Sequence, residues 1–107
     1  MSNFSEDIIN SVWEKAEIVN EGSKNEWRQD YAGAWINKNQ YGEESDYGWE
    51  IDHANPVSNG GGDELANLMP LNWRNNRTKS DDYPSFKTSV TSDGNKNIEK
   101  EKNWKYN

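Results

Sequence analysis

The sequence predicts a small α+β domain built from two helices and several short strands. Apolar side chains in residues 5–17 recur at spacings of three and four, which is the period of one helix face. Residues 49–53 alternate between apolar and polar, which is the period of a half-buried strand. The apolar segment 68–71 favours another strand, and residues 72–80 favour a helix that ends before Pro84.

The first helix has a recognisable beginning at Ser5. A serine hydroxyl can cap a helix, and the carboxylates of Glu6 and Asp7 suit the positive end of the helix dipole. The apolar residues of this segment then fall on one face: Ile8, Ile9, Val12, Trp13 and Ala16. We expect this face to pack into the core of the domain.

Short elements follow the first helix. We expect a single helical turn over 27–31, a strand over 33–39 and a loop over 42–48. In the next strand, Trp49 and Ile51 share one face and should point into the core. Glu50 should lie on the opposite, exposed face, although the sequence leaves open a supporting role for it beside the site.

A long loop should connect the two strands at 49–53 and 68–71. Pro56 and the run Gly60–Gly62 are incompatible with regular structure, and Asp63 can cap a short turn after them. Together these elements predict a single domain over residues 1–88. The remaining residues, 89–107, are rich in Ser, Thr, Asn, Lys and Glu, and we expect a polar tail that is partly helical or disordered.

Composition limits the class of protein further. Only 31% of the residues are hydrophobic, but six Trp, five Tyr and two Phe can each bury a large area, so a few side chains can form a core. The absence of Cys excludes disulfides and thiolate metal sites. No apolar run is long enough to span a bilayer, and the first residues do not resemble a secretion signal. We therefore expect a cytoplasmic protein without a membrane partner.

The charge is unevenly distributed along the chain. The net charge is −7, which by itself argues against nucleic-acid binding. Residues 1–70 carry a net charge of −10, whereas residues 71–107 carry +3. Any contact with phosphate groups should therefore come from the second part of the chain.

The segment 49–80 contains an ordered set of residues that carry chemistry. They are Asp52-His53, Pro56, Gly60-Gly61, Asn67-Leu68, Asn76 and Lys79. This order and spacing resembles the HNH endonuclease family, whose fold is called ββα-metal. The resemblance covers about residues 12–84, and the stretch 76–81 is especially similar to the HNH domain of RNA-guided CRISPR nucleases. It implies a ββα-metal core over 49–80, with N-terminal helical segments and short strands beside it.

His53 is the residue best suited to activate water in such a protein. It is the only His in the chain, and imidazole is the side chain whose ordinary pKa lies near neutrality. The resemblance implies that His53 is the general base in the hydrolysis of a phosphodiester, and that Asp52 and Asn76 complete the catalytic set. Because strand neighbours point to opposite faces, Asp52 and His53 can share a cleft only where the strand twists or ends.

The resemblance also implies one divalent metal ion, held by Asp52 and Asn76. Two oxygen ligands with water completing the shell suit Mg²⁺ or Mn²⁺. Many relatives carry cysteine pairs that bind a structural zinc, and two of those positions correspond here to Asn72 and Asn75. We therefore expect no structural zinc, and we expect Asn75 at the surface.

The remaining motif residues have structural roles in this interpretation. The Asn67 amide should bridge backbone groups of the long loop and hold His53 in place. Gly60 and Gly61 should adopt backbone conformations that other residues disfavour, while Pro56 helps to end the strand.

The helix should supply contacts to nucleic acid through three basic side chains: Arg74, Arg77 and Lys79. The leading interpretation is an endonuclease that acts on double-stranded DNA in preference to RNA. Two alternatives stay open from the sequence. One is a non-catalytic module on a degenerate HNH scaffold that binds nucleic acid or protein, and the other is a toxin-like domain delivered by a larger protein.

Overall fold

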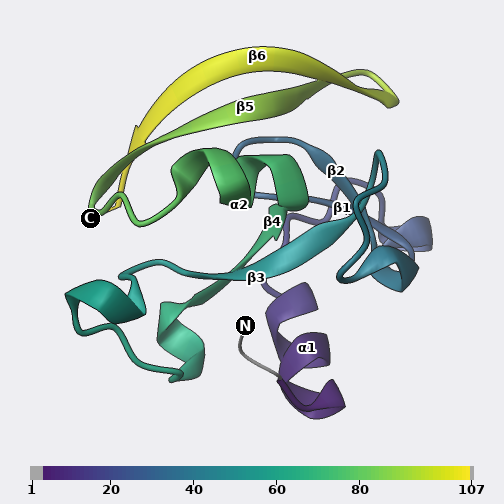
Figure 1. The fold of residues 1–107 in the computed structure, drawn as a ribbon. Coiled ribbons are helices and arrows are strands. Elements are labelled where there is room, and N and C mark those ends of the chain that lie inside the picture. The colour runs from purple at the N-terminus through teal and green to yellow at the C-terminus, as the bar shows by residue number, and fades with distance from the viewer. Residues whose placement is uncertain (1–3, 107) are drawn as a thin grey trace.

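Three antiparallel strand pairs and two short helices make up residues 4–106 of the computed structural model (Figure 1). The chain is therefore α+β, as the sequence predicted. The helices are α1 (Glu6–Trp13) and α2 (Trp73–Lys79), and the strand pairs are β1 (Trp27–Gln29) with β2 (Trp35–Asn37), β3 (Trp49–His53) with β4 (Leu68–Asn72), and β5 (Ser85–Asp93) with β6 (Lys96–Lys105). Residues 1–3 of the predicted domain and Asn107 of the predicted tail lie outside the described residues.

Helix α1 begins where the sequence indicated. The Ser5 hydroxyl accepts a hydrogen bond from the backbone N–H of Ile8 at 3.2 Å. The helix ends at Trp13, earlier than expected, because the chain turns to pair with another segment. The backbone N–H of Glu17 donates to the carbonyl of Gln29 at 2.8 Å, and the N–H of Gln29 donates back to Glu17 at 3.1 Å.

The helical turn expected over 27–31 is wrong. This segment forms β1, whose Arg28 pairs with Ile36 of β2. The strand pairing satisfies the backbone groups that a single helical turn would leave open. A tight turn between the two strands follows, in which Gly33 adopts a φ of +85° and Asp30 accepts hydrogen bonds from two backbone N–H groups.

Strands β3 and β4 and helix α2 follow one another in the chain. His53 pairs with Leu68 and Asp52 with Met69, so the long loop closes directly at the end of β3 (Figure 1). The Asn72 side chain accepts the N–H of Arg74 and caps α2. Beneath the sheet lies the apolar core, in which the rings of Trp13 and Trp49 pack with centroids 5.5 Å apart.

The polar tail expected over 89–107 is wrong. Its described residues belong to a long hairpin of β5 and β6 that arches over α2 (Figure 1). The inward side chains Phe86, Thr88 and Val90 are buried and alternate with more exposed ones, and Gly94 makes the turn with a φ of +63°. The predicted boundary at residue 88 therefore falls inside a strand.

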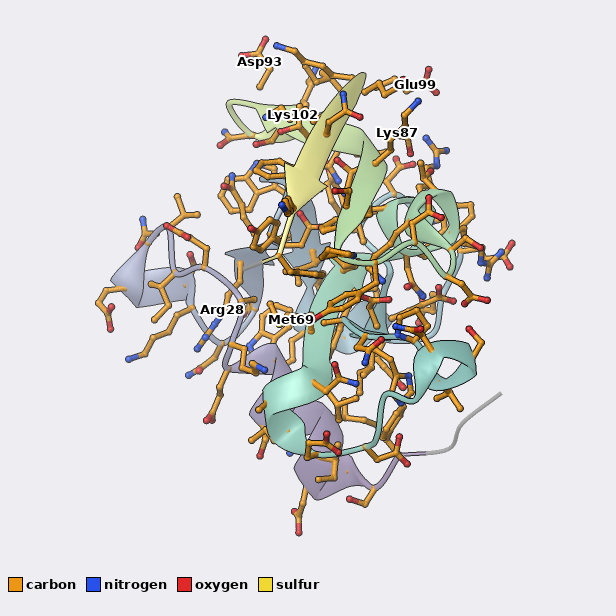
Figure 2. All side chains as sticks on the ribbon, turned by 90° about the vertical axis from the view of Figure 1, so that its left-hand side faces the viewer. Arg28, Met69, Lys87, Asp93, Glu99 and Lys102 are labelled. Carbon is orange, nitrogen blue, oxygen red and sulfur yellow. The ribbon has the colours of Figure 1, made fainter. Side chains whose placement is uncertain are left out.

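Charged side chains lie along the margin of this hairpin. Lys87, Asp93 and Glu99 are at the margin of the molecule (Figure 2), and Glu99 reaches toward Arg74 of α2. Within residues 4–106 no helix is long and apolar enough to cross a membrane.

Candidate functional site

An open cleft of about 440 Å³ lies where β3 ends and where the second half of α2 passes beside it. It is lined by Ile51, Asp52, His53, Pro56, Val57, Ser58, Asn76, Arg77, Ser80 and Asp81. The structure thus brings together three residues that the sequence singled out for chemistry, namely Asp52, His53 and Asn76. The strand stops at His53, and this is why two consecutive side chains can border the same cleft.

Asp52 is the most deeply placed carboxylate of the cleft, with 5% of its surface exposed. One of its oxygens, Oδ1, lies 3.3 Å from the ammonium of Lys79. The other, Oδ2, is buried without a hydrogen-bond partner among the described residues. A carboxylate oxygen in this situation suits a cation ligand, because binding an ion would replace the missing hydrogen bonds.

Burial raises the pKa of Asp52 to about 6, although the ammonium of Lys79 acts in the opposite direction. The carboxyl is therefore ionised at neutral pH and becomes protonated in mildly acidic solution. Among residues 4–106 no group of three or more Asp, Glu and His side chains gathers in a way that could hold an ion alone. An ion held by Asp52 and Asn76 would therefore have water as most of its shell, as Mg²⁺ commonly does.

Lys79 is not at the surface, which corrects the expectation of a phosphate contact. Its side chain is fully buried, because the hairpin covers that face of α2. Besides the ion pair with Asp52, its ammonium donates to the backbone carbonyls of His53 at 3.3 Å and Ala54 at 3.2 Å, and lies 5.6 Å from the ring centre of Phe86. Lys79 thus fixes the end of β3 from the inside.

His53 presents a half-buried imidazole to the cleft. Its Nε2 lies 2.6 Å from Oδ1 of Asp63, which comes from the long loop. The ring of Phe4 packs nearby, with centroids 5.9 Å apart. His53 is therefore held by a carboxylate and by an aromatic ring, and Nδ1 is its only ring nitrogen without a partner among the described residues.

Asn76 is oriented by Glu50. The Asn76 Nδ2 donates to Oε1 of Glu50 at 3.0 Å, and the amide oxygen is thereby left for other ligands. The second Glu50 oxygen accepts from Arg77 at 3.2 Å, and Arg77 also pairs with Glu44 at 3.0 Å. Arg77 therefore borders the cleft, but two carboxylates already neutralise its charge.

The long loop is closed by Asn67, as expected. Its Nδ2 donates to the carbonyls of Asn55 and Gly62, and its Oδ1 accepts the N–H of Asn55 at 2.8 Å. Gly60 adopts a left-handed φ of +89°, and a Cβ at Gly61 would lie 1.7 Å from the carbonyl oxygen of Asn55. Pro56 precedes a short turn over Val57–Asn59 and also borders the cleft.

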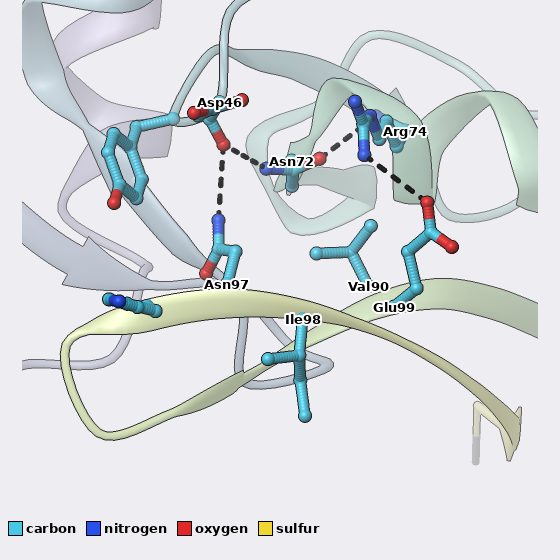
Figure 3. Close-up of a pocket in the computed structure, with 9 residues that line it drawn as sticks. Asp46, Asn72, Arg74, Val90, Asn97, Ile98 and Glu99 are labelled. Carbon is cyan, nitrogen blue, oxygen red and sulfur yellow. Dashed lines mark hydrogen bonds and ion pairs between the residues drawn. The ribbon is translucent and has the colours of Figure 1, made fainter.

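Arg74 lies at the other end of α2, away from this cleft. It borders a second pocket beneath β6 and pairs with Glu99 at 3.9 Å (Figure 3). In the same pocket the side-chain amides of Asn72 and Asn97 both donate to the backbone carbonyl of Asp46. The three basic side chains expected to contact nucleic acid therefore lie apart: Arg77 borders the cleft, Arg74 borders the second pocket, and Lys79 is buried.

Asn75 is fully buried, which contradicts the surface position expected for it. Its Oδ1 accepts the N–H groups of Ser89 and Val90, and its Nδ2 donates to the Val90 carbonyl and to Oδ2 of Asp30. That same Asp30 oxygen accepts the backbone N–H of Asn72 at 2.9 Å. The two positions at which many relatives bind zinc are thus joined here through a buried carboxylate.

Sequence reasoning missed Asp63 and left a supporting role for Glu50 open. Glu50 had a usable signal, because it stands two residues before Asp52 on the same strand and so shares its face. Asp63 had no such signal, because it reaches His53 through an irregular loop whose path no periodicity describes.

One of three comparisons with known proteins gives a match. A family model described as HNH endonuclease matches residues 30–85, which is more than half of the chain. The chain belongs to the HNH endonuclease family. The HNH match covers β2, β3, β4, α2 and the beginning of β5, and it includes every residue of the cleft. Searches of curated proteins and of solved structures give no match.

Proposed function

We propose that this HNH family member is a metal-dependent endonuclease that hydrolyses phosphodiester bonds, with double-stranded DNA as its substrate. The observation that carries this proposal is the single cleft bordered by Asp52, His53 and Asn76. It offers one nitrogen base and two oxygen ligands side by side, which is what hydrolysis of a phosphodiester requires.

His53 acts as the general base in this proposal. Its Nδ1 accepts a proton from a water molecule, whose oxygen bonds to phosphorus as the bond between phosphorus and the leaving oxygen breaks. The leaving oxygen takes up a proton from a second water molecule, His53 later returns its proton to the solvent, and the products are a phosphate end and a hydroxyl end. A positioned base of this kind contributes on the order of a hundred- to ten-thousand-fold in rate.

Asp52 and Asn76 would hold one divalent ion, Mg²⁺ or Mn²⁺. The unpartnered Oδ2 of Asp52 and the amide oxygen that Glu50 leaves free on Asn76 support this assignment. When bound, the ion would polarise the phosphate and stabilise the charge that develops on the leaving oxygen. Lys79 keeps Asp52 in place but also competes for its charge, so we expect a modest affinity for the ion.

Plasmid cleavage tests the proposal. We expect nicking of supercoiled DNA with Mg²⁺ or Mn²⁺, none with EDTA, and slower cleavage of RNA. His53→Ala should lower the rate by roughly a hundred-fold or more while metal binding survives. Asp52→Asn should lose metal affinity and activity together.

Ser58→Ala provides a matched control, because Ser58 borders the cleft and its hydroxyl has no hydrogen-bond partner among the described residues. It should cleave like the wild type. Undiminished cleavage in excess EDTA would remove the metal from the proposal. Wild-type turnover in His53→Ala would remove His53 as the base, and a wild-type protein without cleavage under any condition would indicate a non-catalytic scaffold.

A further inference from the structure

The carboxylate that contacts His53 is unusually exposed for a residue with a specific partner. Asp63 stands on the long loop with 71% of its side chain exposed, whereas only 14% of the His53 side chain is exposed. An exposed aspartate ordinarily points into water. Here its Oδ1 approaches the imidazole Nε2 to 2.6 Å, which is the length of a charge-assisted hydrogen bond.

The loop is built in a way that aims Asp63 at this nitrogen. The carbonyl of Gly62, the residue just before it, accepts a hydrogen bond from the Asn67 amide at 2.9 Å. The N–H of Gly61 donates to the carbonyl of Pro56, also at 2.9 Å. On the other side of Asp63, the carbonyl of Glu64 accepts the N–H of Asn67 at 2.8 Å. The backbone is therefore held on both sides of Asp63, which keeps its side chain within reach of His53.

We propose that Asp63 is a positioning residue that fixes the ring orientation and the tautomer of His53. This inference rests on the proposed function, because it concerns the base of that reaction. A neutral imidazole carries one proton, and an ionised carboxylate can only accept a hydrogen bond. The contact with Oδ1 therefore holds the proton on Nε2 and leaves the lone pair on Nδ1.

The consequence is a base that is ready before substrate binds. Nδ1 has no partner among the described residues, and the ring borders the same cleft as Asp52 and Asn76. Phe4 restricts the ring from a second direction. Without Asp63 the proton would exchange between the two nitrogens and the ring would rotate more freely, so a smaller fraction of molecules would present a lone pair to water.

Nitrogen-15 NMR of the imidazole tests the tautomer directly. His53 is the only His in the chain, so its two ring nitrogens can be assigned without ambiguity. In the neutral ring of the wild type we expect a protonated Nε2 and an unprotonated Nδ1. Asp63→Ala should shift both signals toward those of free imidazole. Asp63→Asn should restore the wild-type pattern in part, because its amide oxygen can still accept from Nε2.

Cleavage kinetics give the second measurement. Asp63→Ala should lower kcat by about ten- to a hundred-fold with KM and metal affinity unchanged, and Asp63→Asn should recover part of that loss. Glu64→Ala is the matched control, since it removes a neighbouring, exposed carboxylate that makes no hydrogen bond or ion pair with His53 among the described residues. Its NMR signals and kcat should equal those of the wild type.

Two outcomes would overturn the proposal. The first is an Asp63→Ala protein with the wild-type tautomer, and the second is one with wild-type kcat. If that variant did not fold, Asp63→Asn would decide, because it removes the charge but keeps an acceptor for Nε2. A ring that stays mainly protonated on Nε2, with part of the wild-type kcat, would support positioning, whereas free-imidazole signals in a folded Asp63→Asn protein would contradict it. A wild-type protein without nuclease activity would overturn the proposed function, and the tautomer measurement would still report separately on Asp63.

Discussion

Asp30 is the residue whose replacement should damage the fold most. Its carboxylate is 4% exposed and accepts four hydrogen bonds, from the N–H groups of Ala32, Ala34 and Asn72 and from the Asn75 amide, at 2.9 to 3.0 Å. Burial raises the pKa of this carboxyl and the four donors lower it, with burial the larger influence. Asp30 thereby links the turn after β1 to β4 and α2.

Asp30→Ala would leave four donors without an acceptor. An unsatisfied buried donor costs about 1–3 kcal/mol, and partial entry of water reduces the sum, so we expect a loss of roughly 3–5 kcal/mol. For a domain of about 100 residues this corresponds to a fall in Tm of about 12 °C or more. Asp30→Asn keeps the shape but turns an N–H₂ group toward N–H donors, so it should also destabilise strongly.

Urea and thermal unfolding followed by circular dichroism measure this loss. Asp82→Ala is the matched control, because it removes an exposed aspartate whose side chain makes no hydrogen bond. It should stay within about 0.5 kcal/mol of the wild type. An Asp30→Ala protein that lost less than about 1 kcal/mol would refute the reasoning, since all four orphaned donors together would then cost less than the smallest value expected for one.

Further predictions concern the charges around the cleft. Because the pKa of Asp52 is raised to about 6 and an ion needs the carboxylate, metal affinity should fall as pH falls through 6, by about tenfold between pH 7 and pH 5, as calorimetric titration would show. For the metal-free fold the sign is opposite: stability falls as pH rises from about 4 to about 6, because the folded state keeps the Asp52 proton longer than the unfolded one. Glu44→Ala frees one side of Arg77 and should steepen the salt dependence of DNA binding by up to about one unit, whereas Arg77→Ala should flatten it; equal slopes in both variants would exclude Arg77 from the DNA path. Lys79→Met leaves the Asp52 charge buried and unpaired, so it should cost roughly 3 kcal/mol or more in urea unfolding, and a near-wild-type midpoint would contradict the importance of this pair.

Local signals in the sequence were sufficient for the parts of the site that neighbouring residues determine. The alternation of 49–53 predicts β3 within a residue, and the Ser5 cap predicts where α1 begins. The break in the chain before Pro56 indicates why the consecutive residues Asp52 and His53 can border the same cleft. These features depend on hydrogen bonds and periodicity over a few positions, which a sequence displays directly.

The errors over the tail, Lys79 and Asn75 share one origin, which is the hairpin at the C-terminal end. Its polar composition resembles a tail, but Phe86, Thr88 and Val90 alternate correctly for a strand and a Gly follows Asp93 at the turn. If residues 89–107 form a tail, no element is expected to cover the face of α2 that packs against the hairpin. Lys79 was then expected in solution, although it is buried. Burial of a polar side chain depends on what packs over it, and that is a long-range property.

The amide of Asn75 joins α2 to the hairpin, and this determines how the stability of the protein depends on the redox conditions. Asn75 binds the hairpin with hydrogen bonds alone, and the chain has no thiol that an oxidant could modify at this place. Stability should therefore be the same in oxidising and reducing buffers. If the cleft holds Mg²⁺ as proposed, a chelator should remove it without unfolding the chain, and we expect the cleavage activity to recover fully when Mg²⁺ is returned.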